Sequence, residues 1–273
     1  MNSTQAELAD FKALIWAFYR EHPRTFPWRE THDPYRIMLS ELMLQQTQTA
    51  RVVDKYNAWL EELPTVESLA AAPVSQVLTL WQGLGYNRRA LNLQKAAKVI
   101  VDNFGGVVPQ NPADMVSLPG IGPYTAGAIS AFAFNRPVTF IETNIRRVYL
   151  HFFFPDAEAV SDKELMPLIE ATVDPENPRE WYYALMDYGA QLPKRVANPN
   201  RRSKHYSVQS KFEGSGRQAR GRILAYLVDN GKATLVTLQA VLGLDPAKIE
   251  KGLSQLEDEG FLSRDDDTYQ LSH

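Results

Sequence analysis

Glu41 stands in the middle of an apolar segment, where a carboxyl group has unusual chemistry. Ile37 and Met38 precede it by about one helical turn, and Leu44 follows it. Burial among such side chains raises the pKa of a carboxyl group, which then keeps its proton near neutral pH and can act as a general acid. From these residues alone, an ordinary core or surface glutamate is the better interpretation. Glu41 is therefore a candidate acid that needs support from the rest of the chain.

A second candidate site is the segment 118–125, with the sequence LPGIGPYT. Gly120 and Gly122 allow a tight turn and a close approach of the backbone to a ligand. Pro123 opens the next helix, whose N-terminal amides then point outward and suit a DNA phosphate. Taken alone, the segment is better explained as an ordinary hairpin between two helices.

Helices are expected to carry these residues. Apolar residues recur at three- and four-residue spacing from Ala6 to Trp59, whereas strand-like alternation is hard to find. Asp33 and Pro34 fit an N-cap and the first residue of a helix, and further prolines divide the following segments into short helices. We therefore predict an all-α body over residues 1–212.

A linker and a second unit are predicted after this body. Residues 212–217, FEGSGR, have the small, polar composition of a linker. Beyond it we expect a helix over 218–229, a turn at Gly231, a helix ending at Gly243, a helix from Asp245 to Gly260 and a hairpin over 261–271. This order is typical of a winged helix-turn-helix, so residues 217–273 are predicted to form a small winged-helix-like module.

The charge of the chain is nearly balanced, with 29 Lys and Arg against 32 Asp and Glu and a formal net charge of −3. A nucleic-acid partner therefore requires a local basic patch. Residues 191–222 contain nine basic residues and one acidic residue, and we predict phosphate contacts from Arg201, Arg202 and Lys204. A solvated basic loop is an equally good interpretation from charge alone. Residues 223–273 carry four basic and nine acidic residues, which weakens the case for DNA binding by the C-terminal module.

Several classes of protein are excluded by what the sequence lacks. Without cysteine there are no disulfides, thiolate metal sites, cysteine nucleophiles or cysteine-ligated iron–sulfur clusters. Neither a signal peptide nor an apolar run long enough to span a membrane is recognisable. We expect a soluble cytoplasmic protein with no membrane partner.

Five further motifs accompany these candidates along the chain. They occur in the order FPWR (26–29), SELMLQQTQ (40–48), WQGLGY (81–86), IETNIRRV (141–148) and MDYGA (186–190). Together with the hairpin at 118–125, they resemble the helix-hairpin-helix DNA glycosylases, the superfamily of endonuclease III and the adenine glycosylase MutY. The resemblance spans residues 8–192. It implies an all-α fold of two helical subdomains with a DNA-binding cleft between them, followed here by the winged-helix-like module.

The resemblance implies catalytic roles for Glu41, Tyr124, Glu142 and Asn144. Glu41 matches the glutamate that protonates adenine at N7. Glu142 stands where the family nearly always has an aspartate that stabilises or attacks the sugar cation, and Asn144 is implied to orient it. The extra methylene of Glu142 shifts the carboxylate by about an ångström, so either the backbone compensates, as we expect, or activity is altered or lost. By residue type alone, Glu142 is a helix N-terminal glutamate favoured by the dipole.

Tyr124 occupies the position of the Schiff-base lysine in bifunctional glycosylase-lyases. A phenol cannot form an imine, so the resemblance implies monofunctional hydrolysis without lyase chemistry. Tyrosine at this position is similar to some MutY enzymes and also to thymine and uracil mismatch glycosylases. Tyr124 therefore leaves the excised base open.

Further positions are implied to hold DNA. The target nucleotide must leave the duplex, and the residues implied to fill its place or contact the strands are Gln45, Gln46, Tyr86, Asn87, Gly120 and Gly122. Trp28, Arg29 and Tyr183 are implied to line the base pocket. Tyr183 stands where MutY has Gln or Glu, and Asn87 where it usually has a second aromatic residue, so the base and its opposite partner stay open.

Of the family's cofactors, only a monovalent cation is implied for this chain. After Ala190 the family continues into four cysteines that hold a [4Fe–4S] cluster, whereas this chain has none, so no cluster and no required cofactor are expected. The family's hairpin commonly binds a monovalent cation, K⁺ or Na⁺, through backbone carbonyls that would here come from Val116, Leu118 and Ile121. We expect the winged-helix-like module to stand in the place of MutY's 8-oxoguanine-recognition domain, so the resemblance alone does not imply recognition of adenine opposite 8-oxoguanine.

The resulting prediction is a monofunctional DNA glycosylase of base excision repair that hydrolyses the N-glycosidic bond of a flipped, mispaired base. Adenine opposite G or 8-oxoguanine is the first choice of base. A thymine or uracil mismatch glycosylase and a lesion-binding protein without catalysis are the alternatives. The expected partner is double-stranded DNA with a mismatch or lesion, bound by a monomer that is associated with the nucleoid in the cytoplasm.

Overall fold

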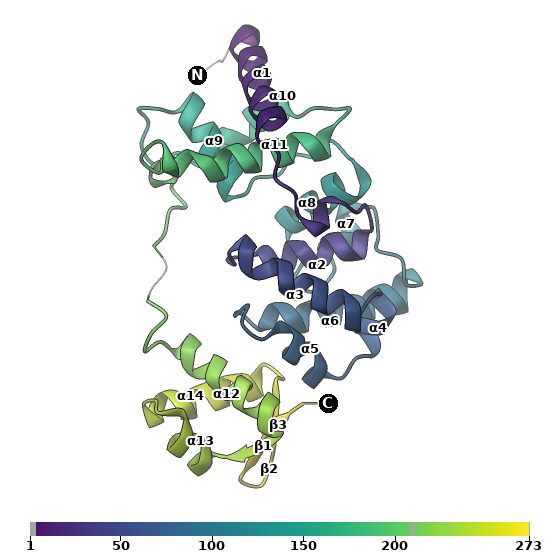
Figure 1. Cartoon of the computed structure of the whole chain (residues 1–273), viewed down its shortest axis with the longest axis vertical. Helices are drawn as coiled ribbons and strands as arrows, with labels where there is room; N and C mark the ends of the chain where they lie inside the picture. Colours follow the sequence, from purple (N-terminus) through teal and green to yellow (C-terminus); the bar gives the residue numbers. More distant parts are fainter. Residues whose placement is uncertain (1–3, 209–210, 273) are drawn as a thin grey trace. The chain divides into compact units, whose positions relative to one another are not determined.

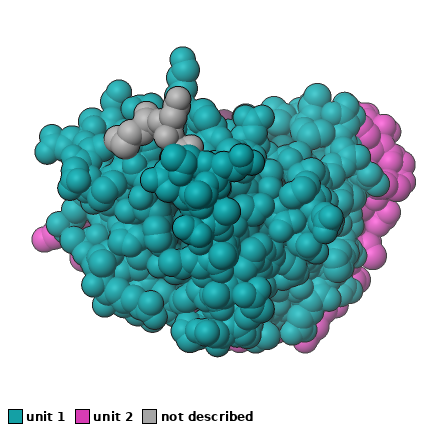
Figure 2. Space-filling view, turned by 90° about the horizontal axis from the view of Figure 1, so that it is seen from above, with its two compact units in different colours: residues 1–41, 108–117, 121–208 teal, residues 42–107, 118–120, 209–273 magenta. Residues whose placement is uncertain are grey.

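Helices make up most of the computed structural model, which describes residues 4–208 and 211–272 (Figure 1). The chain divides into two compact units, which Figure 2 colours separately. Unit 1 contains residues 1–41, 108–117 and 121–208, and unit 2 contains residues 42–107, 118–120 and 209–273. Each unit consists of three segments of the chain, so the chain passes between the units more than once. The first passage lies within helix α2 (Pro34–Leu44).

The regular elements described in unit 1 are helices. Besides most of α2, its elements are α1 (Gln5–Glu21), η1 (Pro27–Arg29), α7 (Pro112–Val116), α8 (Pro123–Phe134), α9 (Thr143–Phe153), α10 (Asp162–Thr172), α11 (Pro178–Gln191), η2 (Leu192–Lys194) and η3 (Pro199–Arg202). Helix α11 packs against α1, α8 and α9, and its Trp181 and Tyr182 are fully buried. Small residues let α8 lie close to its neighbours, because a Cβ on Gly127 would come within 2.8 Å of the Phe140 Cβ.

Unit 2 contains a helical part and a small α/β part. The helical part consists of α3 (Thr49–Glu62), α4 (Val66–Ala71), α5 (Val74–Trp81) and α6 (Arg88–Phe104), and α6 packs against α4 and α5. The second part consists of α12 (Gly216–Asn230), β1 (Lys232–Thr234), α13 (Leu235–Leu242), α14 (Pro246–Asp258), β2 (Leu262–Asp265) and β3 (Thr268–Leu271). Its antiparallel sheet has the order β1-β3-β2, with Ala233 and Arg264 both paired to Tyr269.

The all-α, two-subdomain prediction is confirmed. The three helices and the hairpin expected after the linker also occur in their predicted order. Strand β1 was not predicted, because three residues are too short for a periodic pattern and Gly231 before it marked only a turn. The division into domains 1–212 and 217–273 stays a prediction. None of the helices in the described ranges has both the length and the apolar character needed to span a membrane.

Candidate active site

Glu41 lies in a buried part of unit 1, on α2. Only 6% of its surface is exposed, and Met38 and Leu42 on the same helix are buried as well. Burial is the main cause that raises the pKa of Glu41 from 4.5 to about 7, and the nearby charge of Glu142 raises it further. At neutral pH a large fraction of the Glu41 carboxyl groups is therefore protonated, as a general acid requires.

Tyr124 joins Glu41 in the same unit. It is the second residue of α8, and its hydroxyl donates a hydrogen bond to Oε2 of Glu41 at 3.1 Å. Burial raises the pKa of Tyr124 well above its usual value of 10, so the phenol keeps its proton and remains a donor. This bond favours the ionised form of Glu41 and thus moderates the effect of burial on the pKa of Glu41.

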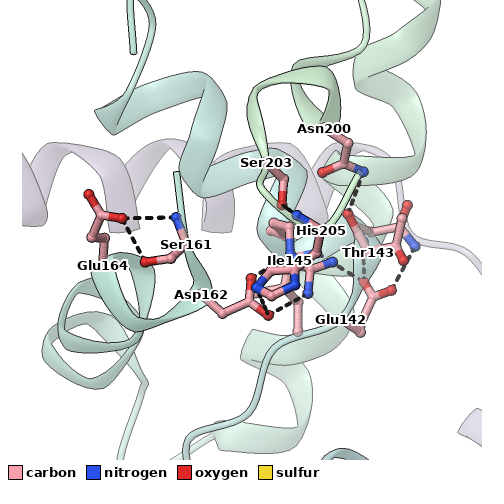
Figure 3. Close-up of polar contacts among 11 residues, drawn as sticks. Glu142, Thr143, Ile145, Ser161, Asp162, Glu164, Asn200, Ser203 and His205 are labelled. Carbon is pink, nitrogen blue, oxygen red and sulfur yellow. Dashed lines mark hydrogen bonds and ion pairs between the residues drawn. The ribbon is translucent and has the colours of Figure 1, made fainter. Parts of the chain in front are cut away.

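Glu142 forms the N-cap of α9. Its Oε1 accepts hydrogen bonds from the backbone amides of Ile145 (2.9 Å; Figure 3) and Asn144 (2.6 Å). Its Oε2 lies 3.4 Å from the Asn144 side-chain nitrogen. The extra methylene is thus folded back onto the helix end, where the amides stabilise negative charge. Burial raises the pKa of Glu142, while the two amides and the charges of Arg147 and Arg146 oppose that rise.

The start of α9 is held by residues from the end of unit 1. Nη1 of Arg147 donates to Oδ1 of Asn144 (2.7 Å) and to the carbonyl of Gly189 (2.6 Å), which turns the Asn144 amide nitrogen toward Glu142. A Cβ on Gly189 would lie 2.4 Å from the carbonyl oxygen of Asn144, so only glycine fits there. Asn200 of η3 donates to the carbonyl of Thr143 at 3.0 Å (Figure 3).

An iron–sulfur cluster does not fit the chain's residues. The chain has no cysteine, and the segment after α11 instead forms η2 and η3. Asn198, the N-cap of η3, and Asn200 within η3 both contact α9. Arg147 donates to Oδ1 of Asn198 at 3.2 Å, so polar side chains fix this segment to the helix of Glu142. Within residues 4–208 and 211–272, there is no group of three or more His, Cys, Asp or Glu side chains that could hold a metal ion.

The residues predicted for the base pocket form a connected cluster in unit 1. Arg29 donates two hydrogen bonds of 2.8 Å to Asp187, which is fully buried. The Arg29 guanidinium lies 4.3 Å from the Tyr183 ring centroid, and Tyr183 stacks on Phe132. The charges of Glu41 and Arg29 both influence the pKa of Tyr183, although burial is the main cause that raises it, so these groups lie within electrostatic reach of one another.

Trp28 is also buried and stacks on Phe26, with ring centroids 5.1 Å apart. Nε of Arg29 is buried and has no hydrogen-bond partner among the residues that the structure describes. Asp187 was not among the predicted site residues, although it lies in the motif at 186–190. Only its position in that motif could have indicated a role for Asp187, because residue type alone does not show whether an aspartate is buried.

Unit 2 contains a further residue that the sequence analysis did not single out, Arg89. Its buried guanidinium donates to the carbonyls of Leu42 (2.7 Å), Met43 (3.0 Å), Gln45 (2.6 Å), Leu84 (3.3 Å) and Gly85 (2.8 Å) and to Oγ1 of Thr47 (3.1 Å). Burial lowers the pKa of Arg89 to about 10, which leaves it charged at neutral pH. Gln46 and Tyr86 in the two connected loops have positive φ angles of 53° and 48°. One side chain therefore fixes both loops that were predicted to contact DNA, and Asn87 precedes its helix as the N-cap residue.

The hairpin glycines have different constraints. Gly120 has a φ of 79°, and a Cβ there would lie 2.7 Å from the Asn92 Cβ in unit 2. Gly122 is the N-cap of α8, and Pro123 is its first residue, as predicted. The φ and the close packing of Gly120 explain why this position needs glycine.

The three basic residues predicted to bind phosphate differ in their surroundings. Arg201 and Lys204 are exposed. Arg202 instead donates to the carbonyls of Pro155 (2.8 Å) and Leu150 (3.0 Å). Arg202 therefore has a structural role within unit 1, and Arg201 and Lys204 are the better residues with which to test DNA binding.

Comparisons with known proteins identify the family of this chain. Residues 39–174 match the family described as "HhH-GPD superfamily base excision DNA repair protein". The adenine DNA glycosylase of Mycolicibacterium smegmatis is 32% identical over 94% of this chain and 93% of its own length. That of Rattus norvegicus is 35% identical over 81% of this chain and 44% of its own length, so this chain spans less than half of the rat protein.

Solved structures of DNA repair proteins are also similar to this chain. A thermostable thymine-DNA glycosylase superposes with a TM-score of 0.62 at 28% identity, over 69% of this chain and 88% of that one. A non-covalent endonuclease III–DNA complex has a TM-score of 0.58 at 20% identity, over 69% and 86%, and supports the fold alone. The fold of this chain is thus that of the helix-hairpin-helix glycosylases. The chain belongs to the HhH-GPD superfamily of base excision DNA repair proteins, and its relatives include adenine DNA glycosylases, as its motifs predicted.

Proposed function

We propose that the protein is a monofunctional DNA glycosylase that hydrolyses the N-glycosidic bond of a flipped adenine in mispaired double-stranded DNA. The observation that carries the proposal is the buried Glu41, whose pKa is raised to about 7 and whose carboxyl group accepts a hydrogen bond from Tyr124. A carboxyl group with this pKa can donate its proton to a base nitrogen at neutral pH.

Each carboxyl group has its own part in the reaction. Glu41 transfers its proton to the base, the C1′–N bond breaks, and the electron pair leaves with the base. Glu142, held at the start of α9, stabilises the positive charge that develops on the sugar. Water then adds to C1′ and loses a proton to the solvent, from which Glu41 regains one, and an abasic site is left. Asn144 and Arg147 keep the Glu142 carboxylate in place.

Tyr124 supports hydrolysis without strand cleavage. No lysine is present at this position of α8, and a phenol forms no imine with the abasic sugar. Incubation with DNA and borohydride should therefore trap no covalent complex, and strands should break only after treatment with alkali. A trapped complex would contradict the monofunctional assignment.

The assignment of adenine is supported by the adenine DNA glycosylases among the relatives. Thymine or uracil in a mismatch is the second candidate, supported by Tyr183 in the base cluster and by the likeness to a thymine-DNA glycosylase. The stacked ring of Tyr183 beside Arg29 can hold either base, since every base has a π-face.

A panel of duplexes separates these candidates. Purified protein is incubated with duplexes containing A:8-oxoG, A:G, T:G or U:G pairs, with matched A:T and C:G duplexes as controls, and abasic sites are revealed with alkali. We expect cleavage of the adenine strand in the first two duplexes and none in the controls. Cleavage only of T:G and U:G would favour the second candidate. Absence of abasic sites in every duplex, with DNA still bound, would contradict a glycosylase and favour a lesion-binding protein.

A monovalent cation at the hairpin is part of this proposal. The tight turn at Gly120, with its φ of 79°, suits a loop whose carbonyls face an ion. Val116, Leu118 and Ile121 would hold K⁺ or Na⁺, which would supply positive charge for a DNA phosphate. The proposed assembly is one protein monomer on one DNA duplex.

A further inference from the structure

Asp187 on α11 is a fully buried carboxylate outside the steps of the proposed reaction. Its Oδ2 and Oδ1 accept hydrogen bonds from Nη1 and Nη2 of Arg29, both at 2.8 Å. The Arg24 guanidinium also lies 3.4 Å from Oδ1. Only 1% of the Asp187 side chain and 9% of the Arg29 side chain are exposed. Because a buried charge requires a partner, Asp187 and Arg29 fix each other's positions.

Arg29 is held by further contacts of its guanidinium and its backbone. Nη1 of Arg29 also donates a hydrogen bond to the carbonyl of Arg24 at 3.0 Å, and the guanidinium lies 4.3 Å from the Tyr183 ring centroid. Nη2 of Arg179 donates to the carbonyl of Arg29 at 2.7 Å. Nε of Arg29 is buried and has no hydrogen-bond partner within residues 4–208 and 211–272. The guanidinium therefore keeps a donor that can turn to another acceptor if Asp187 releases it.

The positive charge of Arg29 acts on Glu41. It lowers the pKa of Glu41, against the burial that raises this pKa to about 7. Arg29 forms its ion pair with Asp187, and no ion pair between Arg29 and Glu41 is found in the described part of the chain. An opposite charge within about 4–6 Å lowers the pKa of a carboxyl group by about one to three units. A direct ion pair with Arg29 would therefore leave Glu41 largely ionised at neutral pH.

Tyrosines and further glutamates also surround Arg29 and Glu41 in unit 1. They are Tyr19 on α1, Tyr124 on α8, Glu142 at the start of α9, and Glu180 and Tyr183 on α11. Burial raises the pKa of each tyrosine, so the phenols stay neutral. Glu180 accepts a hydrogen bond from Tyr19 at 2.7 Å, and Glu142 accepts from the amides of α9. Asp187 is thus the carboxylate of this cluster that binds the Arg29 guanidinium.

We propose that Asp187 is a positioning residue of the glycosylase reaction, which binds both Nη atoms of Arg29 and thereby prevents an ion pair between Arg29 and Glu41. Such a pair would ionise Glu41 and remove the proton that the base must receive. A guanidinium binds a carboxylate best through two parallel N–H donors, and Asp187 takes one donor from each Nη atom. The inference rests on the proposed function, since only a general acid has to keep its proton.

The test follows the titration of Glu41 itself. The full-length protein is labelled with carbon-13 at its glutamate carboxyl groups, and the midpoint of the Glu41 signal, identified with Glu41→Gln, is measured by NMR. Asp187→Asn keeps the size of the side chain but removes its charge, so it should release Arg29 to Glu41 and lower the midpoint by about one pH unit or more. Glu180→Gln is the matched control, because it removes a carboxylate that is 48% exposed on the same helix, and it should leave the midpoint unchanged.

A double-variant cycle tests whether Asp187 acts through Arg29. Arg29→Gln removes the positive charge and should raise the midpoint of Glu41. Without Arg29, the loss of Asp187 has no guanidinium to release, so the double variant should titrate like Arg29→Gln alone. A merely structural role for Asp187 would not produce this recovery. An unmoved midpoint in Asp187→Asn would overturn the inference, as would a double variant that titrates as low as Asp187→Asn.

The inference can also be tested if Asp187→Asn fails to fold. Arg29→Gln leaves Asp187 with Arg24 as a partner, and the double variant contains two neutral amides in place of the buried ion pair. Both should titrate at a higher pH than the wild type. An unmoved midpoint in Arg29→Gln would show that the charge of Arg29 does not reach Glu41, and would overturn the inference.

The two proposals fail in different ways. Single-turnover release of adenine from an A:8-oxoG duplex is measured with the same variants, and the alkaline limb of the rate should follow the midpoint of Glu41. If the wild type releases no base and the midpoints shift as expected, the glycosylase is refuted and the action of Asp187 on Glu41 stands. If the wild type releases the base while the midpoint in Asp187→Asn is unmoved, only the role of Asp187 is refuted. A wild type without base release and with unmoved midpoints would refute both.

Discussion

Replacement of Glu41 by glutamine should change how the stability of the protein depends on pH. The pKa of Glu41 is raised from 4.5 to about 7, mainly by burial. Between these values the folded protein keeps a proton that the unfolded chain releases, so the free energy of unfolding falls as the pH rises and stays low above about 7. A shift of this size corresponds to about 3 kcal/mol, which full burial leaves largely unscreened.

The Glu41→Gln variant is uncharged at every pH and escapes this loss. Urea unfolding of wild type and variant from pH 4 to 8.5 should show a difference that grows by about 3 kcal/mol in favour of the variant between pH 4.5 and 7.5 and is constant above. Glu62→Gln, at an exposed position of α3, is the control and should parallel the wild type. Parallel curves for wild type and Glu41→Gln would refute the assignment of a protonated, buried acid.

Variants at three further residues test other contacts, each within one unit. Tyr124→Phe removes a hydrogen bond that favours the ionised form of Glu41, so the alkaline limb of the single-turnover rate should move up by about one pH unit; an unmoved limb would contradict this. Glu142→Asp should retain excision within about tenfold because it keeps the charge and the N-cap, whereas Glu142→Gln should lose about 100-fold or more; equal rates for both would exclude a role for the charge. Arg89→Ala should cost about 3 kcal/mol in urea unfolding by leaving buried carbonyls without a donor, against less than about 1 kcal/mol for the exposed Arg88→Ala.

Helix boundaries followed closely from local chemistry. Asp33 was predicted as an N-cap, and its side chain accepts from the amides of Tyr35 and Arg36 at 2.9 and 3.2 Å just as α2 begins at Pro34. Pro123 likewise begins α8. Such signals act within a few residues of the chain, so the sequence contains them completely.

The contacts of Arg89 and Asp187 could not be predicted from the sequence. Arg89 stands at the start of a helix, where an arginine is normally exposed, and three of its partners are the carbonyls of Leu42, Met43 and Gln45, more than 40 residues away in the chain. Asp187 meets Arg29 across 158 residues. Partners this distant depend on how the helices pack, which periodicity does not determine.

The surroundings of Glu142 could be predicted only in part. Its place at a helix N-terminus followed from residue type, as did the favourable dipole. The position of the carboxylate at the end of the longer side chain could not be predicted from residue type. It depends on Asn144 and Arg147 and on the close fit of Gly189. The structure shows the carboxylate folded back onto the amides of its own helix.

The most direct test of the account is the release of free base under single-turnover conditions. Wild type, Glu41→Gln and the control Glu62→Gln are mixed in excess with an A:8-oxoG duplex, free adenine is measured by mass spectrometry, and binding is measured on the same duplex. We expect adenine release by wild type and Glu62→Gln, and at least 100-fold slower release by Glu41→Gln with its DNA binding intact. Equal release by Glu41→Gln and wild type would contradict it.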